Sequence, residues 1–106
     1  LRKDKKCDLV ICLSHIGYDY RDDAKKVSDK ILAAKTDNID LILVGHTHTF
    51  LPEPQSFMNK SGKNVLVNQV GFAGLLLGQI DFYFDKNKSV KNISWNNQVI
   101  DDRILG

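Results

Sequence analysis

Long hydrophobic runs are absent from the sequence, and so are an initiator methionine and a signal peptide at its start. A helix needs roughly 20 consecutive apolar residues to cross a bilayer, and we therefore expect no membrane-spanning helix. A signal peptide would place an apolar segment directly after its first basic residues. The chain instead opens on Leu1 and a charged stretch, so we expect it to come from the interior of a longer protein.

An excess of charge of one sign is also missing. The 15 basic and 13 acidic residues leave a formal net charge of +2, and the basic residues form no stripe. Nucleic-acid binding requires a basic surface, so we expect none. Apolar residues make up 42% and charged residues 26% of the chain, as in an ordinary soluble globular protein. Its 106 residues are enough for one small domain with a modest core.

Cysteine is scarce, and the two cysteines, Cys7 and Cys12, lie in one apolar run. Their spacing of five residues places them on opposite faces of a strand, so we do not expect them to pair with each other. We interpret both as small buried residues rather than as metal or redox groups. They do not settle the redox compartment.

Two apolar runs flank a segment of helical period. Residues 7–13 and 39–44 are continuous apolar stretches, typical of strands buried on both faces. Between them, apolar residues recur at intervals of 4, 3, 4 and 3, which predicts a helix over residues 20–35. Asp22 and Asp23 would lie in its first turn and Lys35 near its end, as the helix dipole favours. This order predicts a right-handed βαβ unit with parallel strands. The helical stripe consists of Tyr20, Ala24, Val27, Ile31 and Ala34.

The second half of the chain predicts antiparallel β-structure. Pro52 and Pro54 break the chain, and residues 59–64 form a turn. We expect strands at 65–70 and 75–84, a hairpin turn at 85–88, and a last strand near 90–95 that can continue to residue 100. Trp95 is expected in the core. The predicted fold class is α/β, with a short parallel βαβ unit followed by antiparallel strands.

All three histidines lie in the two loops that follow the strands of the βαβ unit. The carboxyl ends of parallel strands share one edge of a sheet, where α/β proteins place their sites, so His15, His46 and His48 can converge. Gly45 lets the backbone approach a ligand closely, and imidazole binds zinc, iron, manganese and similar ions. One loop histidine, or one His-x-His, is more often structural. Two such loops at one edge favour a metal site.

Two motifs carry a family resemblance. LSHIGYD at residues 13–19, a helix, and DLILVGHTHT at residues 40–49 closely resemble the 5′-nucleotidase branch of the calcineurin-like metallophosphoesterases. NQVGFAG at residues 68–74 and LGQIDF at residues 77–82 look like the strand pair that follows in that family. The resemblance covers nearly the whole chain. It implies that residues 1–106 are a single partial domain, the C-terminal half of a four-layer α/β/β/α catalytic sandwich.

The resemblance also implies a reaction, the metal-dependent hydrolysis of phosphoric esters, nucleotides in particular. His15 and His46 would bind one divalent ion and His48 a second one, with zinc, manganese, iron or similar ions as candidates. The family's other ligands come from Asp-x-His, Gly-Asp and Gly-Asn-His-Glu motifs, none of which occurs in this sequence. We therefore expect no catalytic residue here besides the metal ligands. The isolated chain should be inactive, and it should associate with its missing N-terminal half or with itself through uncovered apolar surface.

Four further residues are candidates for the site. Asp19 would hydrogen-bond a ligand histidine or, as its place before the predicted helix favours, cap that helix. Thr47, between two histidines, would support them or only fix the loop. Asn68 and Phe72 are candidate substrate contacts. The alternatives for these two are ladder or turn bonding for Asn68 and plain packing for Phe72. Gln69 could also reach the edge of the site, and ladder or turn bonding is its favoured alternative.

Two functions therefore stay open from the sequence. One is part of a nucleotide-hydrolysing metalloenzyme, which the resemblance implies is periplasmic, secreted or at the cell surface. The other is a non-catalytic fragment that binds a single transition metal or serves as a structural or partner-binding piece. The missing ligand motifs separate the two, because only the enzyme requires them in the sequence before Leu1.

Overall fold

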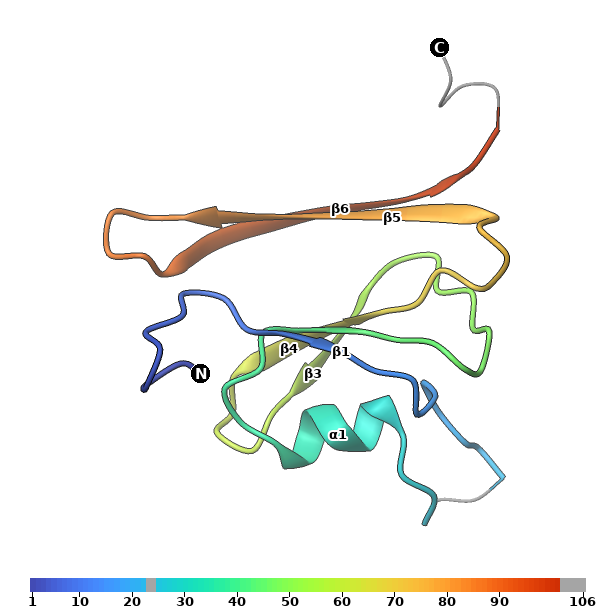
Figure 1. The fold of residues 1–106 in the computed structure, drawn as a ribbon, viewed down its shortest axis with the longest axis horizontal. Helices are drawn as coiled ribbons and strands as arrows, with labels where there is room; N and C mark the ends of the chain where they lie inside the picture. The colour runs from blue at the N-terminus through green and yellow to red at the C-terminus, as the bar shows by residue number, and fades with distance from the viewer. Residues whose placement is uncertain (23–24, 102–106) are drawn as a thin grey trace.

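The structure is a computed structural model that describes residues 1–22 and 25–101. These residues form two β-sheets and one short helix. They lie in three layers, with the helix under the larger sheet and a two-stranded hairpin above it (Figure 1). No helix in the described residues is long and apolar enough to cross a membrane. In chain order the elements are β1 (Ile11–Leu13), α1 (Asp29–Lys35), β2 (Leu41–Leu43), β3 (Gln55–Met58), β4 (Asn64–Asn68), β5 (Leu76–Phe84) and β6 (Val90–Val99).

The larger sheet has the strand order β1-β2-β4-β3. Strands β1 and β2 run parallel in the register Cys12 to Ile42, which confirms the predicted βαβ unit. β4 runs parallel to β2 and antiparallel to β3, so it belongs to both the parallel and the antiparallel parts of this sheet. β3, which was not predicted, begins directly after Pro54 and pairs antiparallel with β4 at the edge of the sheet. Proline is tolerated there because an edge strand has a free side.

The helix is shorter than its apolar stripe predicts. Residues 20–22 and 25–28 are not helical, and 23–24, with Ala24 of the stripe and Asp23, lie outside the described residues. Ser28 is the N-cap, and its hydroxyl accepts a hydrogen bond from Ile31 N at 3.4 Å. The first free N–H groups, of Asp29 and Lys30, donate to carbonyls of the loop that follows β1. That loop occupies the place of an additional helical turn, and it leaves Val27 61% exposed.

A small core lies between α1 and the larger sheet. Ala33, rather than the predicted Ala34, faces this core, and the only acidic residue in the first turn is Asp29. Lys35 lies in the last turn, as predicted. Cys7 and Cys12 are both unpaired, which confirms that no disulfide joins them. The buried core residues are Ala33, Ile42, Val65 and Val67.

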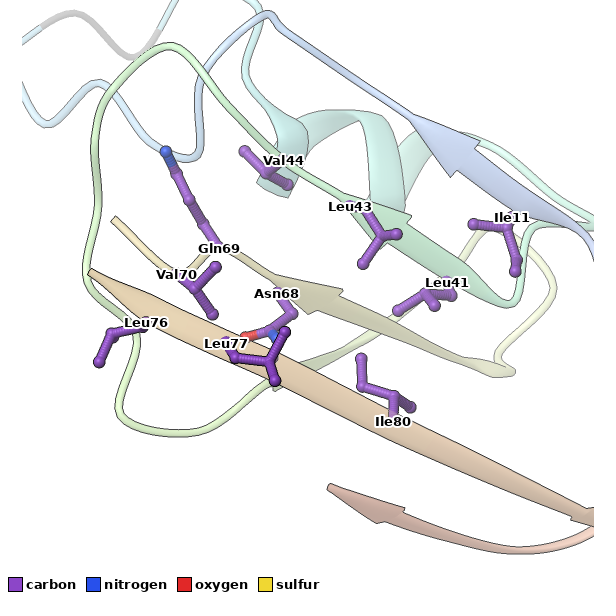
Figure 2. A pocket seen from close by; sticks show the side chains of 11 residues that line it. Ile11, Leu41, Leu43, Val44, Asn68, Gln69, Val70, Leu76, Leu77 and Ile80 are labelled. Carbon is purple, nitrogen blue, oxygen red and sulfur yellow. The ribbon is translucent and has the colours of Figure 1, made fainter. Parts of the chain in front are cut away.

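The second sheet is the hairpin of β5 and β6. It has the predicted turn at 85–88, where Asp85 N donates to Ser89 O at 2.9 Å, and β6 continues to Val99. An apolar cavity of about 490 Å³ lies between the hairpin and the larger sheet (Figure 2), and Leu76, Leu77, Gly78 and Ile80 line it from β5. Trp95 pairs with Ile80 across the hairpin and is 45% exposed, so its assignment to the core was wrong.

Candidate functional site

Two of the three histidine rings meet at the carboxyl edge of the larger sheet. His15 follows β1 and His46 follows β2, and their ring centroids are 5.2 Å apart with an interplanar angle of 63°. Gly45 is required at this point, because a Cβ there would lie 2.7 Å from His15 Nδ1. The His48 ring stacks on Phe72, with centroids 4.8 Å apart and an angle of 24°. The two loops thus bring His15 and His46 together, and a third loop supplies a wall for His48.

The loop of residues 45–49, called here the 45–49 loop, has an unusual backbone. His46 has φ of 76° and His48 has φ of 55°, so both lie in the left-handed region. Residues other than glycine rarely adopt this region, and each costs on the order of 1–3 kcal/mol of strain. The His-x-His segment is therefore not the extended strand in which alternate residues simply share a face. Such strained residues persist only where the surrounding structure fixes them.

Thr47 joins the two histidine loops. Its Oγ1 accepts a hydrogen bond from Tyr18 N at 3.1 Å and lies 2.9 Å from Thr49 Oγ1. Its methyl group also packs on Gly17, where a Cβ would approach to 2.7 Å. These contacts fix the 45–49 loop against the loop that carries His15. The structure describes Thr47 as a support for loop geometry, one of its two predicted roles.

Asp19 has a different partner from those expected. Its Oδ2 accepts from Lys30 Nζ at 3.3 Å in a partly exposed ion pair. The helix cap is Ser28, so the expectation that Asp19 caps the helix was wrong. The physical reason is the late start of α1, which leaves Asp19 a full loop away from the first helical residue. A hydrogen bond from Asp19 to a histidine stays a prediction.

The candidate substrate contacts lie in different surroundings. Asn68 is 4% exposed, and its side-chain amide forms two 3.0 Å hydrogen bonds with the amide of Asn97. Asn97 also donates to Leu51 O at 2.8 Å, so this pair links the hairpin to the larger sheet. Phe72 is 47% exposed and contacts both His48 and, edge-on at 5.6 Å, Phe50. Phe72 therefore borders the histidines, whereas the polar atoms of Asn68 are occupied between the sheets.

Sequence reasoning gave too little weight to Gln69. Its side chain is 2% exposed and reaches from the end of β4 into the 45–49 loop. A glutamine after a buried strand is usually a surface residue, so only its neighbours in the folded chain reveal its position.

The Asp29 carboxylate is buried at the base of the loop that carries His15. Asp29 is 0% exposed, and among residues 1–22 and 25–101 neither of its carboxylate oxygens has a hydrogen-bond partner. Burial raises the pKa of this carboxyl above its ordinary value. The neighbouring Ser14 hydroxyl lowers the pKa in part, without completing a hydrogen bond of normal geometry. The backbone N–H of Asp29 donates to Gly17 O at 2.7 Å, so Asp29 also anchors that loop.

Replacing Asp29 by asparagine should stabilise the chain at neutral pH. Because the folded-state pKa is raised, the cost of burying the ionised form is absent below the ordinary value of 3.8 and is greatest above the raised value. We expect Asp29→Asn to raise the free energy of unfolding by about 1–3 kcal/mol at pH 7, with a gain that shrinks as the pH falls toward 3.8. Urea unfolding at several pH values measures it.

The exposed carboxyl of Asp37 is a control of opposite sign. The Ser61 hydroxyl, 2.5 Å from Asp37 Oδ2, lowers the pKa of Asp37. Asp37→Asn should therefore lower stability at pH 7 and lose that effect in acid. A loss of stability in Asp29→Asn at neutral pH would contradict the unpaired state of the buried carboxyl.

No complete metal site lies within the described part of the chain. In residues 1–22 and 25–101, no group of three or more His, Cys, Asp or Glu side chains is close enough to hold an ion. His15 and His46 would supply two ligands of a tetrahedral or octahedral site, since neutral imidazoles bind zinc and manganese. Such a site would need further ligands from outside these residues.

A parallel βαβ unit with imidazoles at its carboxyl edge, joined to an antiparallel hairpin layer, defines an α/β protein with a candidate metal edge. No family model matches the sequence. The fold is that of a 5′-nucleotidase precursor from Thermus thermophilus, with a TM-score of 0.79 and 24% identity over 96% of this chain and 21% of that one. This match confirms the predicted fold class.

Curated relatives agree with this fold. The chain is 33% identical over 104 residues to an apyrase of Tabanus yao, and 31% identical over 100 residues to the trifunctional nucleotide phosphoesterase protein YfkN of Bacillus subtilis. It is 27% identical to a 5′-nucleotidase of Diplobatis ommata over 115 residues. The matches cover 85%, 94% and 92% of this chain but 18%, 6% and 18% of those proteins. The chain is thus similar to a segment of nucleotide-phosphoesterase and 5′-nucleotidase proteins, as its motifs predicted.

Proposed function

We propose that this chain supplies the imidazole ligands of a two-metal site that hydrolyses phosphoric esters of nucleotides. The observation that carries the proposal is the 5.2 Å approach of His15 and His46 at the carboxyl edge of parallel strands. The names of the relatives, apyrase, 5′-nucleotidase and nucleotide phosphoesterase, support the substrate class. Because the chain spans less than a fifth of these relatives, the activity is proposed for the longer polypeptide.

His15 and His46 would hold one divalent ion, and His48 a second one. Two such ions supply charge neutralisation of the ester and a bound water of lowered pKa. The chain's own contribution is to present neutral imidazoles, which leave the positive charge of the site undiminished. Gly45 leaves room for the first pair, and Phe72 holds the His48 ring by stacking.

The two candidate substrate contacts differ in what they offer. We propose Phe72 as a substrate contact, because it is half-exposed beside His48. We also propose Asn68 for that role, although its side-chain amide is paired with Asn97.

The remaining ligands would come from residues outside this chain. Carboxylate and amide ligands are needed to complete both ions, which is why we propose that the 106 residues alone are inactive. Zinc, manganese and iron all suit a site of this composition. A secreted, periplasmic or cell-surface location is proposed by analogy with the family alone.

Metal stoichiometry tests this proposal. We expect the natural polypeptide that contains these residues, stripped by a chelator and titrated with Mn²⁺, to bind two ions per chain. His46→Ala and His48→Ala should each bind one, because each removes a ligand of a different ion. Retention of two ions by both variants, or a wild-type protein that binds a single ion, would favour the non-catalytic alternative.

A further inference from the structure

Gln69 lies where the 45–49 loop closes around it. Figure 2 shows its side chain directed away from the apolar cavity and toward the loops that follow β1 and β2. The residue is 2% exposed, so water cannot replace a missing hydrogen-bond partner of its amide. A buried primary amide without hydrogen bonds costs roughly 1–3 kcal/mol. The loop must therefore supply the partners of Gln69.

The amide of Gln69 is satisfied entirely by the 45–49 loop. One end lies 3.1 Å from Thr47 Oγ1, and the other end lies 3.0 Å from His48 N and 3.1 Å from Thr49 N. The amide oxygen must face the two N–H donors, and the amide nitrogen then donates to Thr47 Oγ1. Every polar atom of the Gln69 side chain thus bonds to residues 47–49.

Backbone hydrogen bonds frame the loop, and one inside it joins Thr47 N to Gly45 O at 3.0 Å. Val44 N donates to Asn68 O at 3.1 Å before the loop. Leu51 N donates to Gln69 O at 3.1 Å, and Gly71 N donates to Thr49 O at 2.9 Å, after it. Among these backbone bonds none uses the N–H of His48 or Thr49. The Gln69 side chain is the group that binds both.

The strained backbone explains why this support is needed. His46 and His48 both have positive φ, and the N–H that Gln69 binds belongs to His48 itself. Without an acceptor in this position, the loop would relax toward ordinary φ values. Such a relaxation would rotate the peptide groups of the loop, and it would change the directions in which the imidazoles of His46 and His48 point.

We propose that Gln69 is a positioning residue that fixes the aim of His46 and His48 by holding the loop in which both adopt a left-handed backbone. Its effect on the loop is independent of catalysis. Its effect on metal affinity rests on the proposed function. Groups that orient metal ligands change affinity by about 10–100-fold when they are removed.

The test uses two variants in the natural polypeptide that contains this chain. Gln69→Met keeps the length of the side chain but removes its acceptor and its donor. Gln69→Glu keeps the acceptor for His48 N and Thr49 N, and the Thr47 hydroxyl can donate to the carboxylate. In the metal-free protein, residue-resolved hydrogen exchange should be roughly tenfold faster at His48 and Thr49 in Gln69→Met, and close to wild type in Gln69→Glu.

Metal affinity is the second readout. Titration with Zn²⁺ alone should give about 10–100-fold weaker binding for Gln69→Met, whereas Gln69→Glu should bind no more weakly than the wild type. Val67→Ala, a buried substitution in the same strand, controls for lost stability. It should leave exchange at His48 and Thr49 unchanged relative to its global stability.

The outcomes separate the two proposals. Unchanged exchange at His48 and Thr49 in Gln69→Met, or equal losses in Gln69→Met and Gln69→Glu, would overturn the positioning role. A wild-type protein that binds no Zn²⁺, combined with faster exchange in Gln69→Met, would sink the proposed function and support the positioning role. Weaker Zn²⁺ binding that Val67→Ala reproduces would overturn the link to metal affinity.

Discussion

Replacing His46 by alanine should lower the turnover of AMP by about 10³-fold in the natural polypeptide that contains this chain. The side chain shares its position at the sheet edge with His15, at a centroid distance of 5.2 Å, so its loss removes a ligand from the most compact part of the proposed site. A lost ion withdraws several kcal/mol of transition-state stabilisation. Steady-state assays with AMP and p-nitrophenyl phosphate measure the effect.

Combinations of variants make this expectation sharper. If His15 and His46 hold the same ion, the double variant should lose about as much as either single variant, because residues that act as a unit are not additive. Gln79→Ala, on the exposed part of β5, is the control and should stay within about twofold of wild type, as a surface change away from the site. Turnover by the rigorously purified 106-residue chain that is lost on His48→Ala would contradict the expected inactivity of the isolated chain.

Continuous apolar runs made the parallel strands predictable. Strands buried on both faces need such runs, and the two in this sequence correspond to β1 and β2, which pair in parallel. The polarity of these strands alone predicts that His15 and His46 lie on one edge, where the structure places them. Hairpin turn chemistry at 85–88 likewise located β5 and β6.

Competing local bonds explain where the helix prediction was wrong. A stripe of helical period continues from residue 20 to 34, yet the helix begins after Ser28. The Ser28 hydroxyl caps α1, and the carbonyls of Gly17 and Tyr18 accept hydrogen bonds from its first N–H groups. Both carbonyls belong to the loop that follows β1. Hydrophobic periodicity carries no information on such partners. β3 was missed for a related reason, since four residues after a proline become a strand only when β4 offers an edge.

The site was predictable by residue type but not by its supports. Histidines after strands are visible in the sequence, whereas the positive φ values of His46 and His48 arise from contacts across the loop. Gln69 reaches that loop from another strand, 21 residues beyond His48 in the chain. Thr47 was recognised because it lies between the histidines. Thr47 could be found because it is adjacent to the histidines in sequence, whereas Gln69 could be found only from the fold.

The apolar face of the β5–β6 hairpin should drive self-association of the 106-residue chain. The register places Leu76, Ile80 and Phe82 on one face together with their partners Ile93, Trp95 and Val99. Of these, Ile93 is 37% exposed, Trp95 45% and Val99 51%, and the cavity beneath Ile80 is open to solvent. A soluble monomer rarely leaves a contiguous apolar patch of more than a few hundred Å². We expect a dimer at micromolar concentration that buries about 1,000 Å² or more.

A charge placed on this apolar face should prevent the association. Ile93→Lys buries an unpaired ammonium in the expected interface, at a cost of several kcal/mol, and should weaken the dimer by at least about 100-fold. Asn92→Lys is the matched control, because it adds the same charge to the opposite face of the same strand. Sedimentation velocity and the blue shift of Trp95 emission report the association. A wild-type chain that sediments as a monomer without binding an apolar dye would show that the hairpin closes on the larger sheet in solution. An equal loss of dimer in both lysine variants would show that net charge, rather than the apolar face, controls the association.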